Sequence, residues 1–223
     1  MDKHLPPSYR LSPAARRLRM LRVRQDTLAH TDSRYAQLVA DVLHSCAVET
    51  VFDIHPRGCA VGVLLRQCGY RGRIITFEPT STAWDQLRYC SMTDELWQLS
   101  RSSIRRQEDV LLSDSDAFPL VSTRLETAIE VFCDEAEILA IWLSQPTDWI
   151  LLEDIHPLPS VRVINLACSV AGESESAPTI ERALTVLRQG QWEILAVQSR
   201  PPVEGRQSIY ADVLAVRMPL SGR

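Results

Sequence analysis

The stretch VFDIHPRGC (51–59), followed by GYRGRIITFEP (69–79), decides the fold of this chain. Residues 51–54 form a short apolar run, and residues 73–77 are rich in β-branched side chains, which is typical of buried strands. Between these runs, apolar residues recur at helical spacing over 61–68. The order strand, helix, strand predicts a βαβ unit, and a parallel pair of strands needs such a helical crossover.

Two acidic residues stand at the predicted strand ends. Asp53 lies at the end of the first strand, and Glu78 directly follows the second strand, 25 residues later. Ligands of open α/β sheets bind at the carboxyl ends of the strands, where a second acid roughly 20 residues on can bind ribose hydroxyls. Both residues have a second interpretation. Asp53 can accept hydrogen bonds from the N–H groups of the following turn, and Glu78 can cap a helix that begins near Ser81.

These segments resemble the beginning of the FkbM family of S-adenosylmethionine-dependent methyltransferases. The family pattern is a strand ending in Asp-x-Gly-x-x-x-Gly, a Gly-Tyr-x-Gly-x-Ile turn and a strand ending in Phe-Glu-Pro. The matching residues of this chain are Gly69, Tyr70, Gly72, Ile74, Phe77, Glu78 and Pro79. The resemblance covers about 51 to 217 and implies a Rossmann-like class I methyltransferase fold, a mostly parallel sheet with a C-terminal antiparallel strand pair. It also implies a site for S-adenosylmethionine at Asp53, Gly58 and Glu78, which we expect to be vestigial or weak.

The chain departs from the family pattern in the turn after the first strand. His55 stands at the first turn glycine and Cys59 at the second, with Gly58 one position early. A β-carbon obstructs a turn that must take a positive φ or let a ligand approach the backbone. His55 therefore has two interpretations, the general base of a rebuilt site or a plug in an empty nucleoside pocket.

A second departure lies at the fourth predicted strand. Residues 124–129 resemble the family's Arg-Leu-Asp-Asp-x-Leu segment and set the register. In this register Ala140 and Trp142 replace a lysine and an aspartate that face the reaction centre in the family. Alanine has no side-chain proton to exchange, and an indole N–H only donates. We therefore expect no general base or metal ligand there, and we expect Trp142 in the core.

Chain length supports this register. A fourth strand at 149–154 would leave about six residues before the strand at 161–169, whereas a parallel crossover needs a dozen or more. A strand at 138–143 leaves room for a helix over 146–156, with proline at its favoured first position.

The rest of the chain closes the fold. Pro178 is predicted to open another helix, and residues 192–197 and 209–216 are predicted to form a terminal strand pair. The prediction is a sheet with helices on both faces.

Composition is typical of one compact domain. The chain has 223 residues, of which 45% are hydrophobic and 23% charged, enough to bury a full α/β core. We divide it into an N-terminal helical segment (1–48) and a methyltransferase-like domain (49–223). Its six cysteines are scattered without a Cys-x-x-Cys pair, which favours a reducing cytoplasm over a disulfide framework or a zinc site. We expect no membrane segment, because no apolar run is long enough to span a bilayer.

The N-terminal arm is basic. Residues 1–30 carry seven Lys or Arg and two Asp, a net charge of +5, so the remainder must carry −9 to reach the total of −4. Residues 11–24 are predicted to form an arginine-rich helix, and residues 35–46 the apolar face of a second helix. The first helix either covers the sheet edge as a solvated helix or docks on a protein partner or a second copy. Nucleic acid is disfavoured because no aromatic residues interleave the arginines.

The tetrapeptide Asp-Ile-His-Pro occurs twice, at 53–56 and at 154–157. A shared metal site would require the two segments to converge with deprotonated ligands. The second copy falls at a predicted helix C-terminus, where a histidine is stabilised by the helix dipole without a ligand. We therefore predict no metal.

Two function classes remain. One is a degenerate methyltransferase-fold protein that serves as a pseudoenzyme, a partner or a repurposed protein in natural-product or glycan biosynthesis. The other is an active, divergent S-adenosylmethionine-dependent O-methyltransferase that acts on a hydroxyl of a sugar or secondary metabolite. Four positions of the family pattern are replaced in this chain, by His55, Cys59, Ala140 and Trp142, and these losses favour the first class.

Overall fold

A computed structural model describes residues 33–56, 58–106, 110–111, 120–170, 178–200 and 210–217. The predicted helix at 11–24 lies outside this part of the chain.

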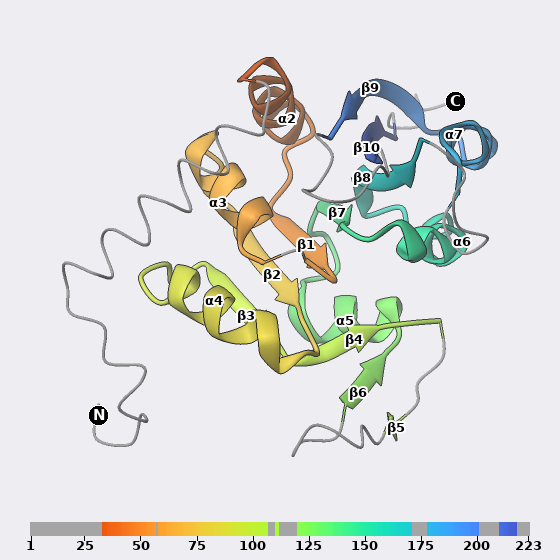
Figure 1. The fold of residues 1–223 in the computed structure, drawn as a ribbon. Helices are drawn as coiled ribbons and strands as arrows, with labels where there is room; N and C mark the ends of the chain where they lie inside the picture. Colours follow the sequence, from red (N-terminus) through yellow and green to blue (C-terminus); the bar gives the residue numbers. More distant parts are fainter. Residues whose placement is uncertain are drawn as a thin grey trace, which may run out of the picture.

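A seven-stranded sheet of order β3-β2-β1-β7-β8-β10-β9 forms the centre of the molecule (Figure 1). Its first five strands are parallel, and β10 runs antiparallel to both β8 and β9. The strands are β1 (Thr50–Ile54), β2 (Arg73–Phe77), β3 (Trp97–Ser100), β7 (Leu139–Leu143), β8 (Val161–Ser169), β9 (Glu193–Ser199) and β10 (Tyr210–Val216). The predicted fold class is confirmed, a Rossmann-like, mostly parallel sheet with a C-terminal antiparallel strand pair.

The predicted register of the fourth strand is also confirmed. β7 lies between β1 and β8, and every residue of β7 pairs with one of β1, from Leu139 opposite Thr50 to Leu143 opposite Ile54. The strand order therefore reverses between β1 and β7. Such a switch point is where ligands bind at the carboxyl edge of an open α/β sheet.

Helices cover both faces of the sheet, as predicted. One face packs against α2 (Ser33–Ser45), α3 (Ala60–Gln67) and α4 (Ser81–Ser91). The other packs against α5 (Leu125–Phe132), the 3₁₀ helix η2 (Pro146–Leu151), α6 (Leu152–Ile155) and α7 (Ile180–Gln189). We call these the α2 face and the α7 face. Residues of α2 share a core with residues of the sheet. The predicted boundary between an N-terminal segment (1–48) and a domain (49–223) stays a prediction.

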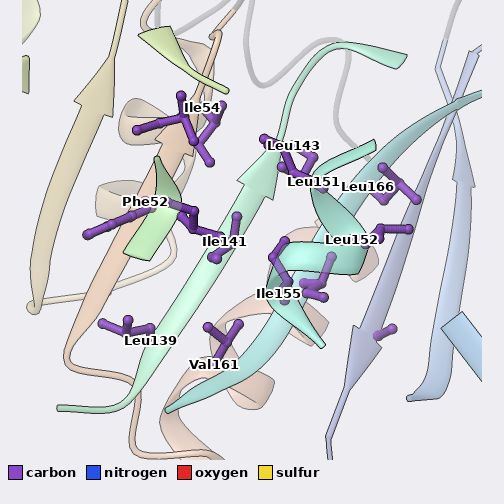
Figure 2. Packing of buried hydrophobic residues seen from close by; sticks show 14 of the residues in the cluster. Phe52, Ile54, Leu139, Ile141, Leu143, Leu151, Leu152, Ile155, Val161 and Leu166 are labelled. Atoms are coloured by element: carbon purple, nitrogen blue, oxygen red, sulfur yellow. The ribbon is translucent and has the colours of Figure 1, made fainter. Parts of the chain in front are cut away.

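Strand periodicity assigns each side chain of β1 to a face. Phe52 and Ile54 belong to the core of the α7 face, and Figure 2 shows them beside the side chains of β7 and of the η2–α6 segment. Val51 belongs to the core of the α2 face, and Asp53, two residues later, projects to the same side. A carboxyl group is therefore placed inside the sheet on its α2 face.

Two helices differ from their predicted form. The helix expected over 146–156 begins as 3₁₀ helix η2 and becomes α-helical only in α6. The helix expected to open at Pro178 begins at Ile180, because Thr179 provides the N-cap and accepts a hydrogen bond from the N–H of Arg182 at 3.3 Å. None of the described helices combines the length and apolarity needed to cross a bilayer.

A small second sheet was not predicted. Its order is β4-β6-β5, with β4 (Ser102–Ile104) parallel to β6 (Leu120–Thr123) and β5 (Val110–Leu111) antiparallel to β6. β4 follows β3 after the single residue Arg101, so this sheet begins at the carboxyl edge of the main sheet. It brings polar side chains of β4 close to the end of β1.

Candidate functional site

The candidate site lies at the carboxyl ends of β1, β2 and β7. Backbone hydrogen bonds continue beyond these strands: the N–H of His55 donates to Phe77 O at 3.1 Å, and the N–H of Ser144 donates to Ile54 O at 3.3 Å. The N–H of Glu78 donates to Ser100 O at 3.0 Å. The predicted residues Asp53, His55 and Glu78 are thereby held at one edge of the sheet.

Asp53 is a fully buried carboxyl group. Its Oδ1 accepts a hydrogen bond from Ser144 Oγ at 3.1 Å, and its Oδ2 is the one buried side-chain polar atom of the described residues without a partner. Burial raises the pKa of Asp53 to about 7. The hydrogen bond from Ser144 lowers this pKa, whereas the charges of Glu78 and Asp148 raise it further. The prediction that Asp53 binds N–H groups of the following turn is not what the structure shows, since β1 projects the carboxyl into the sheet interior.

His55 has a left-handed backbone conformation, with φ of +47°. Such a φ costs a residue with a β-carbon roughly 1–2 kcal/mol, which glycine avoids. The turn therefore has, at residue 55, a backbone conformation that favours glycine, although the side chain is a histidine.

The imidazole ring of His55 is bonded through both nitrogens. Nδ1 lies 2.7 Å from Asp148 Oδ1, and Nε2 lies 2.8 Å from Ser103 Oγ. The other carboxylate oxygen of Asp148 accepts the N–H of Gln145 at 3.0 Å, and Arg105 Nε donates to Ser103 Oγ at 3.3 Å. We call these three hydrogen-bonded side chains the Ser103–His55–Asp148 relay. Sequence reasoning missed Ser103 and Asp148, which lie 48 and 93 residues from His55.

The turn has a second rebuilt position. Gly58 has φ of +74°, and a β-carbon there would meet Gln86 Oε1 at 3.1 Å. Cys59, which stands at the family's second glycine, is the buried N-cap residue of α3, and its sulfur accepts a hydrogen bond from Gln86 Nε2 at 3.7 Å. A hydrogen bond with Cys90 lowers the pKa of the Cys59 thiol. Gly58 thus supplies the conformation, and Cys59 joins the core beside α4.

Glu78 is buried and already has partners in its own turn. One carboxylate oxygen accepts the N–H of Thr80 at 2.7 Å and also the hydroxyl of Thr80. Thr80 is the N-cap residue of α4, so Glu78 fixes the start of that helix. Glu78 is therefore not the cap itself, because Thr80 occupies the N-cap position and α4 has no side-chain capping hydrogen bond. Binding of a ribose by Glu78 stays a prediction.

The fourth strand carries no polar side chain at the two replaced positions. Ala140 and Trp142 are buried in the core of the α2 face, with Trp142 2% exposed. Trp142 is the register partner of Asp53. The prediction that Trp142 is a core residue is confirmed.

A further polar cluster lies on the α2 face of β8 and β10. Tyr35 donates its hydroxyl to Asn165 Oδ1 at 2.7 Å, and Asn165 Nδ2 donates to Asp212 Oδ1 at 3.4 Å. Arg200 forms two hydrogen bonds with the Asp212 carboxylate. Burial alone would lower the pKa of Arg200, but Asp212 raises it above its ordinary value. The side chains of this cluster bond to one another, and the positive charge of Arg200 lowers the pKa of Asp53.

The second Asp-Ile-His-Pro segment has a structural role. His156 is the C-cap residue of α6, as predicted, and its Nδ1 accepts a hydrogen bond from Trp192 Nε1 at 3.3 Å. In the described part of the chain, no three His, Cys, Asp or Glu side chains come together as a metal site would require.

Comparison with known proteins gives likenesses of fold. No protein-family model matches the sequence, and no curated protein matches it either. Among solved structures, the chain is similar to Aeropyrum pernix fibrillarin with bound S-adenosyl-L-methionine (17% identity, TM-score 0.45, 76% of this chain and 66% of that one). It is also similar to the N-methyltransferase NodS from Bradyrhizobium japonicum WM9 (11% identity, TM-score 0.48, 83% of this chain and 96% of that one). A third similar structure is the precorrin-6y C5,15-methyltransferase from Geobacter metallireducens GS-15 (12% identity, TM-score 0.49, 82% of this chain and 86% of that one). Likenesses of this strength carry no argument about reaction or substrate.

Proposed function

We propose that this chain is a degenerate methyltransferase-fold protein of FkbM-like ancestry in which His55 closes the site for S-adenosylmethionine. On this proposal it is not an efficient methyl transferase and serves as a pseudoenzyme, a partner or a repurposed protein in natural-product or glycan biosynthesis. One observation carries the proposal: both ring nitrogens of His55 are bonded within the protein, to Asp148 and Ser103.

The contacts around the turn support closure. A ligand that approached the backbone at residue 55 would have to displace the imidazole from two buried partners, Asp148 and Ser103. Leaving buried polar groups unsatisfied costs about 1–3 kcal/mol each. These residues do not fit the cofactor as they stand.

Calorimetric titration with S-adenosylmethionine tests the proposal. We expect no saturable heat from the wild-type chain, and measurable binding by the double variant His55→Gly, Cys59→Gly. His44→Gly, at the exposed end of α2, is the matched control and should bind no better than wild type. A wild-type dissociation constant in the low micromolar range, about −8 kcal/mol, would contradict closure.

The double variant separates binding from chemistry. Ala140 and Trp142 remain in it, so the fourth strand still supplies no general base, a function worth about 10²- to 10⁴-fold in rate. We therefore expect the double variant to bind the cofactor without transferring methyl groups to a metabolite extract. Methyl transfer at a rate well above the uncatalysed background would show that another base acts.

The second candidate is an active, divergent O-methyltransferase that acts on a hydroxyl of a sugar or secondary metabolite. The hydrogen bond from His55 to Asp148 favours it, because a carboxylate on Nδ1 makes Nε2 a better base. If the wild-type chain methylates a component of the extract and His55→Ala abolishes this, the site is rebuilt around His55.

A further inference from the structure

The relay has more order than closure of a pocket requires. A side chain that only filled the pocket would need no hydrogen-bond partners. The imidazole of His55 instead lies between the hydroxyl of Ser103 and the carboxylate of Asp148, with one ring nitrogen bonded to each. In the neutral imidazole, if Nδ1–H donates to Asp148 Oδ1, then Nε2 accepts the hydrogen of the Ser103 hydroxyl. The separations of 2.8 Å and 2.7 Å lie within the reach expected for a nucleophile, its base and the group that orients the base.

Each member of the relay is held by a different element. His55 follows β1, Ser103 is the middle residue of β4, and Asp148 lies in the first turn of η2. The Asp148 carboxylate is fixed by the N–H of Gln145 at 3.0 Å and is 5% exposed. Such positioning by rigid neighbours is what a catalytic series of side chains needs.

An ion-pair bridge joins two of these elements. Arg106, just after β4, lies 2.9 Å from Glu153 and 3.4 Å from Asp154 of α6, which continues η2. The bridge connects the strand of Ser103 to the helical segment of Asp148.

Arg105 adds a cation at the hydroxyl. Its Nε lies 3.3 Å from Ser103 Oγ, and its side chain is exposed, whereas Ser103 is 4% exposed. The hydroxyl is therefore covered on one side by a long, solvated side chain that can move aside. A guanidinium at this distance can also stabilise negative charge that develops on an attacked carbonyl oxygen.

We propose that Ser103 is a nucleophile for the hydrolysis of carboxylic esters, with His55 as its general base and Asp148 as the positioning residue. This activity needs no S-adenosylmethionine.

The reaction balances with water as the second substrate. Ser103 Oγ forms a bond to the carbonyl carbon while its proton passes to His55 Nε2. The tetrahedral intermediate collapses by breaking the bond to the alcohol oxygen, which leaves with that proton. Water then gives a proton to Nε2 as its oxygen bonds to the acyl carbon. Cleavage of the Oγ–acyl bond releases the acid, and Oγ recovers the proton.

A fluorophosphonate probe tests the nucleophile directly, because a reactive serine displaces fluoride and keeps the phosphonyl group. We expect the wild-type chain to gain one adduct, located on Ser103 by peptide mass spectrometry. Ser103→Ala should lose the adduct, whereas Ser102→Ala should keep it, since the Ser102 hydroxyl bonds to Ser100 instead of His55. No adduct on wild-type Ser103, or an adduct that survives in Ser103→Ala, overturns the proposal.

Hydrolysis of p-nitrophenyl acetate tests the roles of the other two residues. We expect His55→Ala and Asp148→Asn each to slow the Ser103-dependent rate by about 10²-fold or more. Asp148→Glu should recover part of that loss, because a carboxylate again faces Nδ1, and thermal unfolding of each variant checks that the fold is kept. Equal rates for wild type and Asp148→Asn would overturn the role of Asp148, and equal rates for wild type and Ser103→Ala would overturn the whole proposal.

Discussion

At the scale of single residues, Asp53 links the sheet to the site. Its carboxyl group is fully buried, and one of its oxygens has no partner among the described residues. The charged form is therefore disfavoured, and the pKa rises to about 7 from the ordinary 3.8.

This shift makes stability depend on pH. Between about pH 4 and pH 7 the unfolded chain has lost the proton of Asp53 while the native chain keeps it, so the unfolded state binds fewer protons. The free energy of unfolding should then fall as pH rises, by about 1.4 kcal/mol per pH unit for this group alone. Asp53→Asn cannot ionise, and its side-chain oxygen can still accept the Ser144 hydroxyl.

Urea unfolding of wild type and Asp53→Asn across this range checks the effect. We expect the stability of the variant relative to wild type to increase from pH 5 to pH 7. Parallel pH profiles for the two proteins would show that Asp53 is ionised in the native state throughout.

The residues of the site were predictable to the extent that they stand at strand ends. Asp53 lies near the end of one apolar run, His55 follows that run and Glu78 follows a second run, and the structure places all three at one edge. Ser103 and Asp148 gave no local signal. They meet His55 only because β4 and η2 fold back over the end of β1.

At the scale of elements, α3 is placed by contact with Trp97. The backbone of Gly62 lies so close to this indole that an added β-carbon would be 2.2 Å from Cζ2 and 2.3 Å from Cη2. The indole is buried and donates its N–H to Thr76 Oγ1 at 2.9 Å, so it cannot retreat easily.

Gly62→Ala should therefore destabilise the protein by about 1–3 kcal/mol, as overpacking usually does. Helix propensity alone would give the opposite sign, with a gain of up to about 1 kcal/mol. Denaturant unfolding distinguishes the two. Trp97→Phe removes the atoms in conflict, so Gly62→Ala should cost less in that background, and an undiminished cost would exclude the indole as the cause.

The elements also show where sequence reasoning reached its limit. β7 was placed correctly because the number of residues before β8 excludes the competing apolar run at 149–154. The small sheet was missed because β4 has three residues and β5 has two, too few to display the alternation by which strands are recognised.

At the scale of the whole molecule, charge is divided between arm and body. The first 30 residues carry +5 and the remaining residues −9. We propose that the arm docks on an acidic protein partner or on a second copy of the chain, an attraction that salt weakens.

Removal of residues 1–24 tests this proposal. We expect the truncated chain to keep its thermal unfolding transition, since α2 and the sheet form the described core without the arm. Its sedimentation, alone or with captured partners, should differ from that of the full chain at low salt and converge at high salt. Identical sedimentation under all conditions would leave the arm as a solvated cover.

The hydrogen bond from the N–H of His55 to Phe77 O has a consequence for hydrogen exchange. Surface turns usually open and exchange their amides long before the sheet does. The His55 amide instead extends the pairing between β1 and β2, and every residue of β1 is buried. Its amide should therefore exchange at the slow rate of the central strands. Whatever enters the site must then do so by rotation of side chains, because the backbone beneath them opens only when the sheet itself comes apart.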